Sequence, residues 1–303
     1  MLRTAVWILL CLPAISSRGQ LTDQGYRLLP GKRYSLEISV RQNTHSENYY
    51  SRSDLRLDLN MTLHFDIVSA SDSGGYHVEA SYDNLFLSML APDMSIDINS
   101  GKDNLLNILI DSLEQKPFRM YLNRDGSFIL MDSISAFLNT FYHLELSGEE
   151  LDVIIKTLKE AFGTDAFNSL CNLFINIHPT AESGTGWEKQ FTYFFNTRPV
   201  KMINRFFPVK QTNQLRILQG IGMIITEKEI IGSSEQSTVS TTASGSQTYD
   251  LQIDPVTGWL KSGNSRQRIL VKTKILEDSR LPSGLEIPSY VETLFTLTGQ
   301  TEH

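Results

Sequence analysis

Apolar and polar side chains alternate strictly along residues 55–67, which read LRLDLNMTLHFDI. Every odd position in this stretch is apolar, and an extended chain turns all of these side chains toward one face. Such a strand is much longer than the usual five or six residues. We therefore predict a long β-strand with one apolar face, made of Leu55, Leu57, Leu59, Met61, Leu63, Phe65 and Ile67.

The same period of two continues on both sides of this strand. Residues 34–40 alternate before it, and residues 76–82 alternate after the turn-forming segment SASDSGG. At Asn84 the alternation slips by one residue, and the apolar positions continue in the opposite register through Met89. One extra residue in a strand produces such a slip, so we predict a β-bulge near Asn84 that curves the sheet.

The middle of the chain changes to a helical period. Apolar residues recur every three or four positions, which predicts helices, in the segments 102–116, 133–144, 147–163 and 165–175. Alternating segments return from Trp187 onward. Among them, residues 232–247 are rich in Ser and Thr and carry almost no charge, so we expect a mobile loop or an exposed edge ribbon there.

These patterns predict an α+β protein built on a long, curved antiparallel sheet that resembles a half-barrel, with a central helical insertion. We expect an N-terminal β region at residues 20–100 and a C-terminal β region at 181–303. Between them, residues 101–180 should be mostly helical, with a hairpin at 117–131, and the whole should form one compact unit. Both β regions open with a glycine and an aromatic-rich alternating segment, so an ancient duplication is a further hypothesis.

Residues 1–19 have the layout of a secretory signal peptide, with Arg3, then an apolar run too short to span a bilayer, then small residues. No later segment is long and apolar enough to predict a transmembrane span. The whole chain carries a charge of −7, and removal of the signal with Arg3 and Arg18 gives 25 − 34 = −9. This charge argues against nucleic-acid binding. We therefore predict an exported protein, periplasmic or extracellular.

Residue types with catalytic chemistry form no recognised motif. The patterns GxSxG, GxxxxGK[ST] and GxGxxG are absent from the sequence. Cys171 is the one cysteine outside the signal, and its apolar neighbours predict a buried structural thiol. We expect a protein that is not an enzyme and that uses no cofactor.

The polar face of the long strand supplies one cluster of chemical interest. When the apolar face of this strand is aligned with that of the next, His64 lies near Glu79 and Asp66 near His77. Two histidines and two carboxylates can ligate zinc or act as acid–base groups. A solvated, charge-paired face is the alternative, because no HExxH-type spacing occurs. We predict no metal site and keep these four residues as weak candidates.

The same segments carry a family resemblance. The opening LLPGKRYSLEISVRQ, the long strand with its glycine-rich turn, and the later GTGWEKQF and YDLQIDPVTGWL resemble an uncharacterised bacterial secreted family of the Bacteroidetes type. That family is known only as a domain of unknown function, so the resemblance implies no chemistry. In outline the layout is also similar to the curved half-barrel of bacterial lipoprotein carriers, in which helices close an apolar concavity.

The apolar face of residues 55–67 decides between the functional interpretations. Burial of its seven apolar side chains contributes roughly 10–20 kcal/mol before entropy is subtracted, so the face must be covered. Either helices fill the concavity, or part of it stays open for a lipid that these residues line. We predict non-catalytic binding of an apolar or amphiphilic ligand. The alternatives are an interaction module with a closed core, which holds an envelope protein through strand edges or an exposed aromatic such as Phe206 or Phe207, and a metal-dependent hydrolase.

Overall fold

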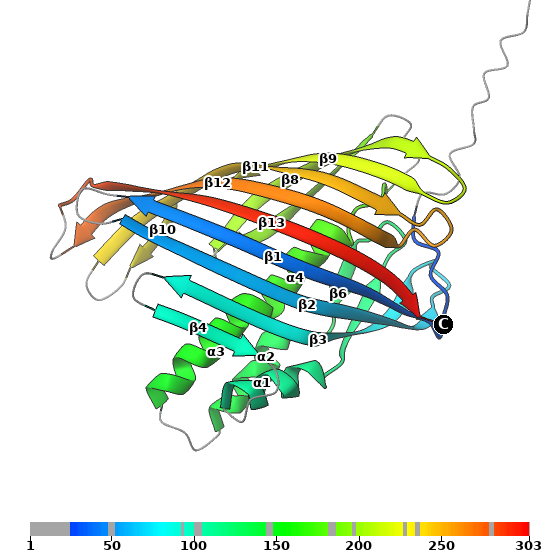
Figure 1. Ribbon diagram of the computed structural model, residues 1–303, viewed down its shortest axis with the longest axis horizontal. Helices are drawn as coiled ribbons and strands as arrows, with labels where there is room; N and C mark the ends of the chain where they lie inside the picture. The colour runs from blue at the N-terminus through cyan, green and yellow to red at the C-terminus, as the bar shows by residue number, and fades with distance from the viewer. Residues whose placement is uncertain are drawn as a thin grey trace, which may run out of the picture.

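A computed structural model describes the chain in these segments: residues 25–47, 52–91, 94–99, 105–143, 148–180, 186–195, 198–226, 229–233, 237–278 and 282–302. The predicted signal peptide, residues 1–19, lies outside them. Within them the chain forms a long arched sheet with the helices gathered under one of its faces (Figure 1).

Antiparallel pairing holds the described strands in a single thirteen-stranded sheet. The order is β6-β5-β3-β2-β1-β13-β12-β11-β9-β8-β7, with β4 added beside β3 and β10 beside β11. The strands are β1 (Arg33–Glu47), β2 (Arg52–Ala70), β3 (Tyr76–Ala91), β4 (Met94–Asn99), β5 (Phe118–Leu122), β6 (Phe128–Leu130), β7 (Trp187–Phe195), β8 (Arg198–Gln211), β9 (Arg216–Ile225), β10 (Ile230–Ser233), β11 (Ser237–Ile253), β12 (Leu260–Asp278) and β13 (Glu286–Glu302).

The first and last strands are neighbours in the middle of this sheet. β1 and β13 pair from Arg33 with Glu302 to Ser46 with Ser289. β6 and β7 form the two ends, and each has one strand partner in the described part of the chain. The sheet is therefore curved but unclosed, as the alternation predicted, and the chain is mostly β with a helical insertion rather than an even mixture of α and β.

The helices come from the middle of the sequence and cover the concave face of the sheet (Figure 1). They are α1 (Leu105–Glu114), α2 (Ile134–Asn139), α3 (Gly148–Phe162) and α4 (Thr164–Phe174), with a 3-10 turn at Thr140–His143. Phe174 packs edge-on against Phe295 of β13, with ring centroids 5.2 Å apart. Cys171 is fully buried, as its neighbours predicted. No helix in the described residues is long and apolar enough to cross a membrane.

Two irregularities bend the pairing of β2 with β3. The predicted bulge is present at Asn84, which has a positive φ of 54°, and the register shifts there between Asn60 and Thr62 of β2. A second register shift lies between Ile67 and Ser69. No slip in the alternation marks this second bulge, because Val68 directly follows Ile67, where the alternating run ends.

Within the Ser/Thr-rich segment 232–247, Gly232 and Ser233 lie in the edge strand β10, whereas residues 237–247 are not the loop or exposed ribbon that the composition predicted. Residues 237–247 belong to β11, which pairs with β12 along its length and with β9 from Ser244 onward. Thr241 and Ala243 are 2% and 8% exposed. A ladder on both sides satisfies the backbone groups, and threonine is favoured in strands, so low charge here reflects burial rather than mobility.

Candidate functional site

The apolar face of β2 lies largely in the core. Leu59, Met61, Leu63, Phe65 and Ile67 are between 0% and 8% exposed. Leu55 and Leu57, nearer the start of the strand, are half-buried. The helices thus cover most of the face that the sequence predicted as a ligand lining.

The predicted pairing of the polar face was wrong by two residues. His64 lies opposite Ser81, and Asp66 lies opposite Glu79. Two features set the observed register: the turn beside the pair Ala70 with Tyr76, and the second bulge, where Val68 is an extra residue of β2 that shifts the pairs beyond it by one.

Three of the four members of that predicted cluster have separate partners. Asp66 accepts from Arg33 Nε at 2.8 Å, and His77 stacks edge-on against Tyr121. His64 Nδ1 lies 2.8 Å from the Ser35 hydroxyl. The described residues contain no group of three or more His, Cys, Asp or Glu side chains placed to hold a metal ion.

The pair Phe206 and Phe207 divides between the two faces of β8. Phe206 is fully buried against Trp187 and Tyr249. Phe207 is half-buried on the other face, where the Arg205 guanidinium lies 5.2 Å from its ring centre.

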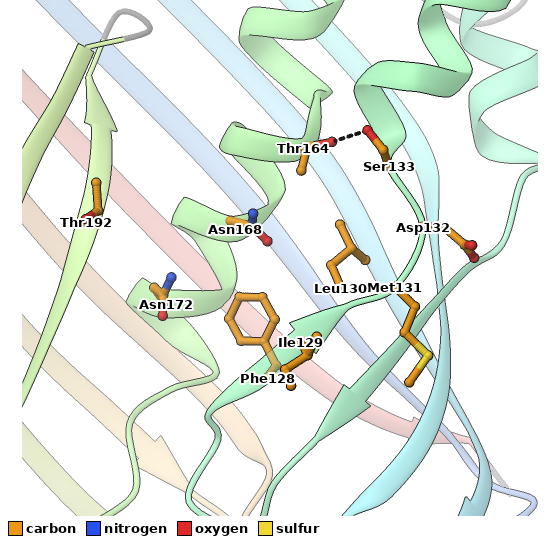
Figure 2. Close-up of a pocket in the computed structure, with 10 residues that line it drawn as sticks. All are labelled: Phe128, Ile129, Leu130, Met131, Asp132, Ser133, Thr164, Asn168, Asn172 and Thr192. Atoms are coloured by element: carbon orange, nitrogen blue, oxygen red, sulfur yellow. Dashed lines mark hydrogen bonds between the residues drawn. The ribbon is translucent and has the colours of Figure 1, made fainter.

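An open groove of about 480 Å³ lies where the sheet fails to close. Its walls come from β6 and the segment after it, from α4, and from β7, so it lies between the two end strands (Figure 2). We call this space the seam groove. Its lining residues are Phe128, Ile129, Leu130, Met131, Asp132, Ser133, Thr164, Asn168, Asn172 and Thr192.

The seam groove has an apolar wall and a polar wall. Phe128 and Leu130 are half-buried and pack against the core, whereas Ile129 and Met131 are 64% and 52% exposed. Alternation along β6 and the residue after it explains this division. The opposite wall carries hydroxyl and amide side chains.

The amide groups stand on α4. Asn168 and Asn172 are four residues apart, which places them on one face of the helix, and Figure 2 shows both beside the groove. The buried stripe of α4, which includes Phe167 and Phe174, lies on another face and fixes the rotation of the helix.

The one charged residue among these groove residues is already paired. Arg119 donates from Nε and Nη2 to the two carboxylate oxygens of Asp132, at 3.0 and 2.8 Å. The backbone N–H of Arg119 adds a third bond at 2.8 Å. These hydrogen bonds hold the pKa of Asp132 at about 2, so the carboxylate stays ionised and matched.

A buried ion pair joins the two ends of the sheet beside the groove. Lys189 of β7 reaches Asp125 in the β5–β6 turn, and only 8% and 16% of the two side chains are exposed. Burial opposes ionisation of Asp125, but hydrogen bonds from Ser127 and Lys189 outweigh it and lower its pKa.

A second buried cluster fills the concavity near this turn. His178 Nε2 donates to the Gly258 carbonyl at 2.9 Å, and His178 Nδ1 accepts from Arg216 at 2.9 Å. The Tyr26 ring stands edge-on to the imidazole, with centroids 4.4 Å apart. Burial, aided by the Arg216 charge, lowers the pKa of His178 to about 3, so the ring is neutral.

A row of polar positions crosses the concave face at right angles to the strands. Direct cross-strand partners from β7 to β1 make up this polar row: Lys189, Asn204, Gly222, Gln247, Gln267, Thr293 and Gln42. Gln267 donates to Gln247 at 2.8 Å, and Asn204 donates to the Tyr249 hydroxyl at 2.6 Å. A one-residue slip of any strand would remove its member from the row, so the row fixes the register.

Sequence reasoning missed the seam groove. Its apolar wall near residue 129 and its β7 wall at Thr192 are far apart in the chain, and no local pattern relates them. The usable signal was the spacing of Asn168 and Asn172, two amides on the polar face of a helix.

Comparison with solved structures gives a shared fold. A structure described as lipid–protein interactions in lipovitellin aligns with 91% of this chain at 12% identity and a TM-score of 0.51. The chain spans about a quarter of lipovitellin, since the alignment covers 26% of that protein. An outer membrane channel from Pseudomonas putida F1 aligns with 91% of this chain and 97% of its own, but at 6% identity and a TM-score of 0.20.

No curated protein matches the chain significantly. The model of an uncharacterised family does match, over residues 73–260. This match covers β3 to the start of β12 and includes the seam groove, and it confirms the predicted resemblance to a domain of unknown function. The chain therefore belongs to DUF6263, a family of unknown function.

Proposed function

We propose that this protein is an exported, non-catalytic binder of an apolar or amphiphilic molecule, which it holds in the seam groove. The observation that carries the proposal is the groove itself, about 480 Å³ in volume with an apolar wall on β6 and an amide wall on α4. Binding clefts for small molecules span roughly 300–1,000 Å³ and combine apolar lining with a few polar groups. The fold shared with lipovitellin, a protein studied for its lipid interactions, supports a lipid-like ligand.

The position of the helices explains why the ligand is placed in the seam groove. They fill the concavity along β2, so Leu63 and Phe65 act as core residues. An apolar guest is instead accommodated where the covering stops, between β6 and β7. The exposed Ile129 and Met131 extend the apolar wall toward solvent, where a guest would enter.

Blocking the groove tests the proposal. Thr192 is an exposed strand residue on the β7 wall, and Thr192→Trp places a large ring in the groove. Thr248→Trp makes the same change at an exposed position of β11 that is not among the groove residues. Binding is followed by the fluorescence of 1-N-phenylnaphthylamine, an uncharged apolar dye.

The expected result is saturable binding to the wild type and to Thr248→Trp, with at least a tenfold weaker affinity in Thr192→Trp. Equal binding by both variants, or no saturable binding to the wild type, contradicts the proposal. Circular dichroism of each variant confirms that the fold is retained.

A second candidate function is protein interaction, favoured by an apolar area on the outer face of β9. Ile221 and Met223 are 57% and 48% exposed there, and Ile203 of β8 lies opposite Met223. Exposed apolar patches mark interaction sites in soluble proteins. Under this alternative, Ile221→Ser with Met223→Ser abolishes capture of an envelope partner, whereas Tyr290→Ser on β13 keeps it.

A further inference from the structure

The polar wall of the seam groove presents amides in a fixed spacing. Asn168 and Asn172 lie one helical turn apart on α4. Asn172 Oδ1 accepts from Asn176 Nδ2 at 3.2 Å, which leaves the Asn172 NH₂ group as a donor toward the groove. Asn168 is half-buried and brings both an amide donor and a carbonyl acceptor.

Hydroxyl side chains extend this wall. Thr192 lies across from α4 on β7, and Thr164 stands at the start of α4 (Figure 2). Thr164 already accepts a hydrogen bond from the backbone of Ser135 at 3.0 Å. A ligand group that both donates and accepts suits such a wall, and hydroxyl groups do both.

The charge of the groove excludes ionised heads. The described lining residues include no lysine, arginine or histidine that could pair with an anionic head. An unpaired charge taken from water into a partly buried site carries a desolvation cost that nothing here compensates.

Asp132 also disfavours both anionic and cationic heads. Its carboxylate, already paired with Arg119, offers an anionic head no positive partner. A cationic head would have to displace the two-pronged Arg119 pair, which also uses the Arg119 backbone N–H. Neither sign of charge therefore finds a free partner among the groove residues.

We infer that the seam groove selects amphiphiles with an uncharged, hydroxyl-rich head, of the glycoside or glycerol class, carried on an alkyl chain. The chain lies against Phe128 and Leu130, and the head hydroxyls bond to Asn168 and Asn172. This inference rests on the proposed function, because it names the ligand class of the same groove. A site built to bond hydroxyl groups discriminates strongly against analogues without them, since its own polar groups are then left unpaired.

The test compares three amphiphiles that share a dodecyl chain, each below its critical micelle concentration. They are dodecyl maltoside with an uncharged hydroxylated head, dodecyl sulfate with an anionic head, and dodecyltrimethylammonium with a cationic head. Isothermal titration calorimetry on the wild-type protein is expected to give at least tenfold tighter binding of the maltoside than of either charged compound.

Matched variants connect the preference to the amides. Asn168→Leu keeps the size of the side chain and removes its hydrogen-bonding groups. It is expected to weaken maltoside binding about tenfold and to leave the charged compounds unchanged. Asn139→Leu makes the same change at the exposed end of α2, outside the groove residues, and is expected to bind like the wild type. Asn168→Gln should restore part of the maltoside affinity.

The outcomes separate this inference from the proposed function. Equal affinity for all three heads, or maltoside binding that Asn168→Leu leaves intact, overturns the ligand class while the groove remains a binding site. Absence of binding by all three compounds overturns the proposed function as well. A preference for one charged head overturns the inference alone.

Discussion

Lys189 Nζ lies 2.9 Å from Asp125 Oδ2 and joins β7, at one end of the sheet, to the β5–β6 turn at the other. In the described part of the chain the two ends of the sheet do not pair as strands, and this buried ion pair links them where a closed barrel has backbone hydrogen bonds. It connects the same two ends between which the seam groove lies. We therefore expect the width of the groove to depend on a contact that involves none of its own lining residues.

Removal of one partner of this ion pair is expected to destabilise the fold strongly. Lys189→Met leaves the Asp125 carboxylate buried without its cation, which costs about 3–5 kcal/mol. Denaturation by urea measures the change in unfolding free energy. The double variant Lys189→Met with Asp125→Asn removes both charges and should recover at least a third of the loss. Equal instability of the single and double variants would show that the charge pairing is not the cause.

Protonation of His178 gives the fold a pH dependence. Its pKa is about 3 in the folded protein against an ordinary value of 6.5. Because the folded-state pKa is depressed, His178 of the unfolded chain binds a proton below about pH 6.5, whereas His178 of the folded chain stays neutral until the pH nears 3. Stability is therefore complete above this pH and falls by up to about 1.4 kcal/mol per pH unit as the pH drops toward 3.

Comparison of His178→Gln with the wild type isolates this effect. A glutamine can still accept from Arg216 and donate to the Gly258 carbonyl, but it does not titrate. Urea denaturation at about pH 7.5 and about pH 4.5 should show a smaller loss for the variant by about 3 kcal/mol. The lowered pKa values of Asp125 and Asp132 add their own losses mainly below about pH 4, outside this window. Identical losses in both proteins would exclude His178 as the titrating group.

Gly222 makes room for a buried amide in the polar row. A Cβ on this residue would lie 2.3 Å from Asn204 Oδ1, so Gly222→Ala must displace that side chain and its bond to Tyr249. We expect a loss of about 2 kcal/mol in unfolding free energy. In an Asn204→Ala background the clash is gone, and the same substitution should cost clearly less. Additive losses in this double-mutant cycle would contradict the proposed clash.

The sheet could be predicted from the sequence wherever a face is buried. The slip at Asn84 exposed one bulge, because shifted apolar residues such as Leu85 and Leu87 must still face the core. The bulge at Val68 left no such trace, since an extra apolar residue beside Ile67 disturbs no pattern. Together with the turn that pairs Ala70 with Tyr76, this extra residue places the polar pairs between β2 and β3 two residues away from the predicted ones.

The candidate site could not be predicted for a different reason. The groove exists because β6 and β7 end the sheet without pairing, and pairing is a property of the whole topology. Nothing in the sequence around Phe128 or Thr192 indicates that both residues line the same groove. The burial of Ser240, Thr241 and Gln247 was hidden in the same way, since a Ser/Thr-rich sequence is compatible with a paired strand as well as with a loop once the neighbouring strands supply hydrogen bonds.

Affinity should rise with the length of the alkyl chain until the seam groove is filled. Each methylene buried against Phe128 and Leu130 contributes about 0.8 kcal/mol. Two added methylenes then contribute about 1.6 kcal/mol, which tightens binding about fifteenfold. Calorimetry with octyl, decyl and dodecyl maltosides measures this slope. Met131→Ser removes part of the apolar wall near the entrance and should lower the slope for the longest chain first. A flat series, with equal affinity for all three chains, would show that the chain stays in water and that the apolar wall on β6 does not hold it.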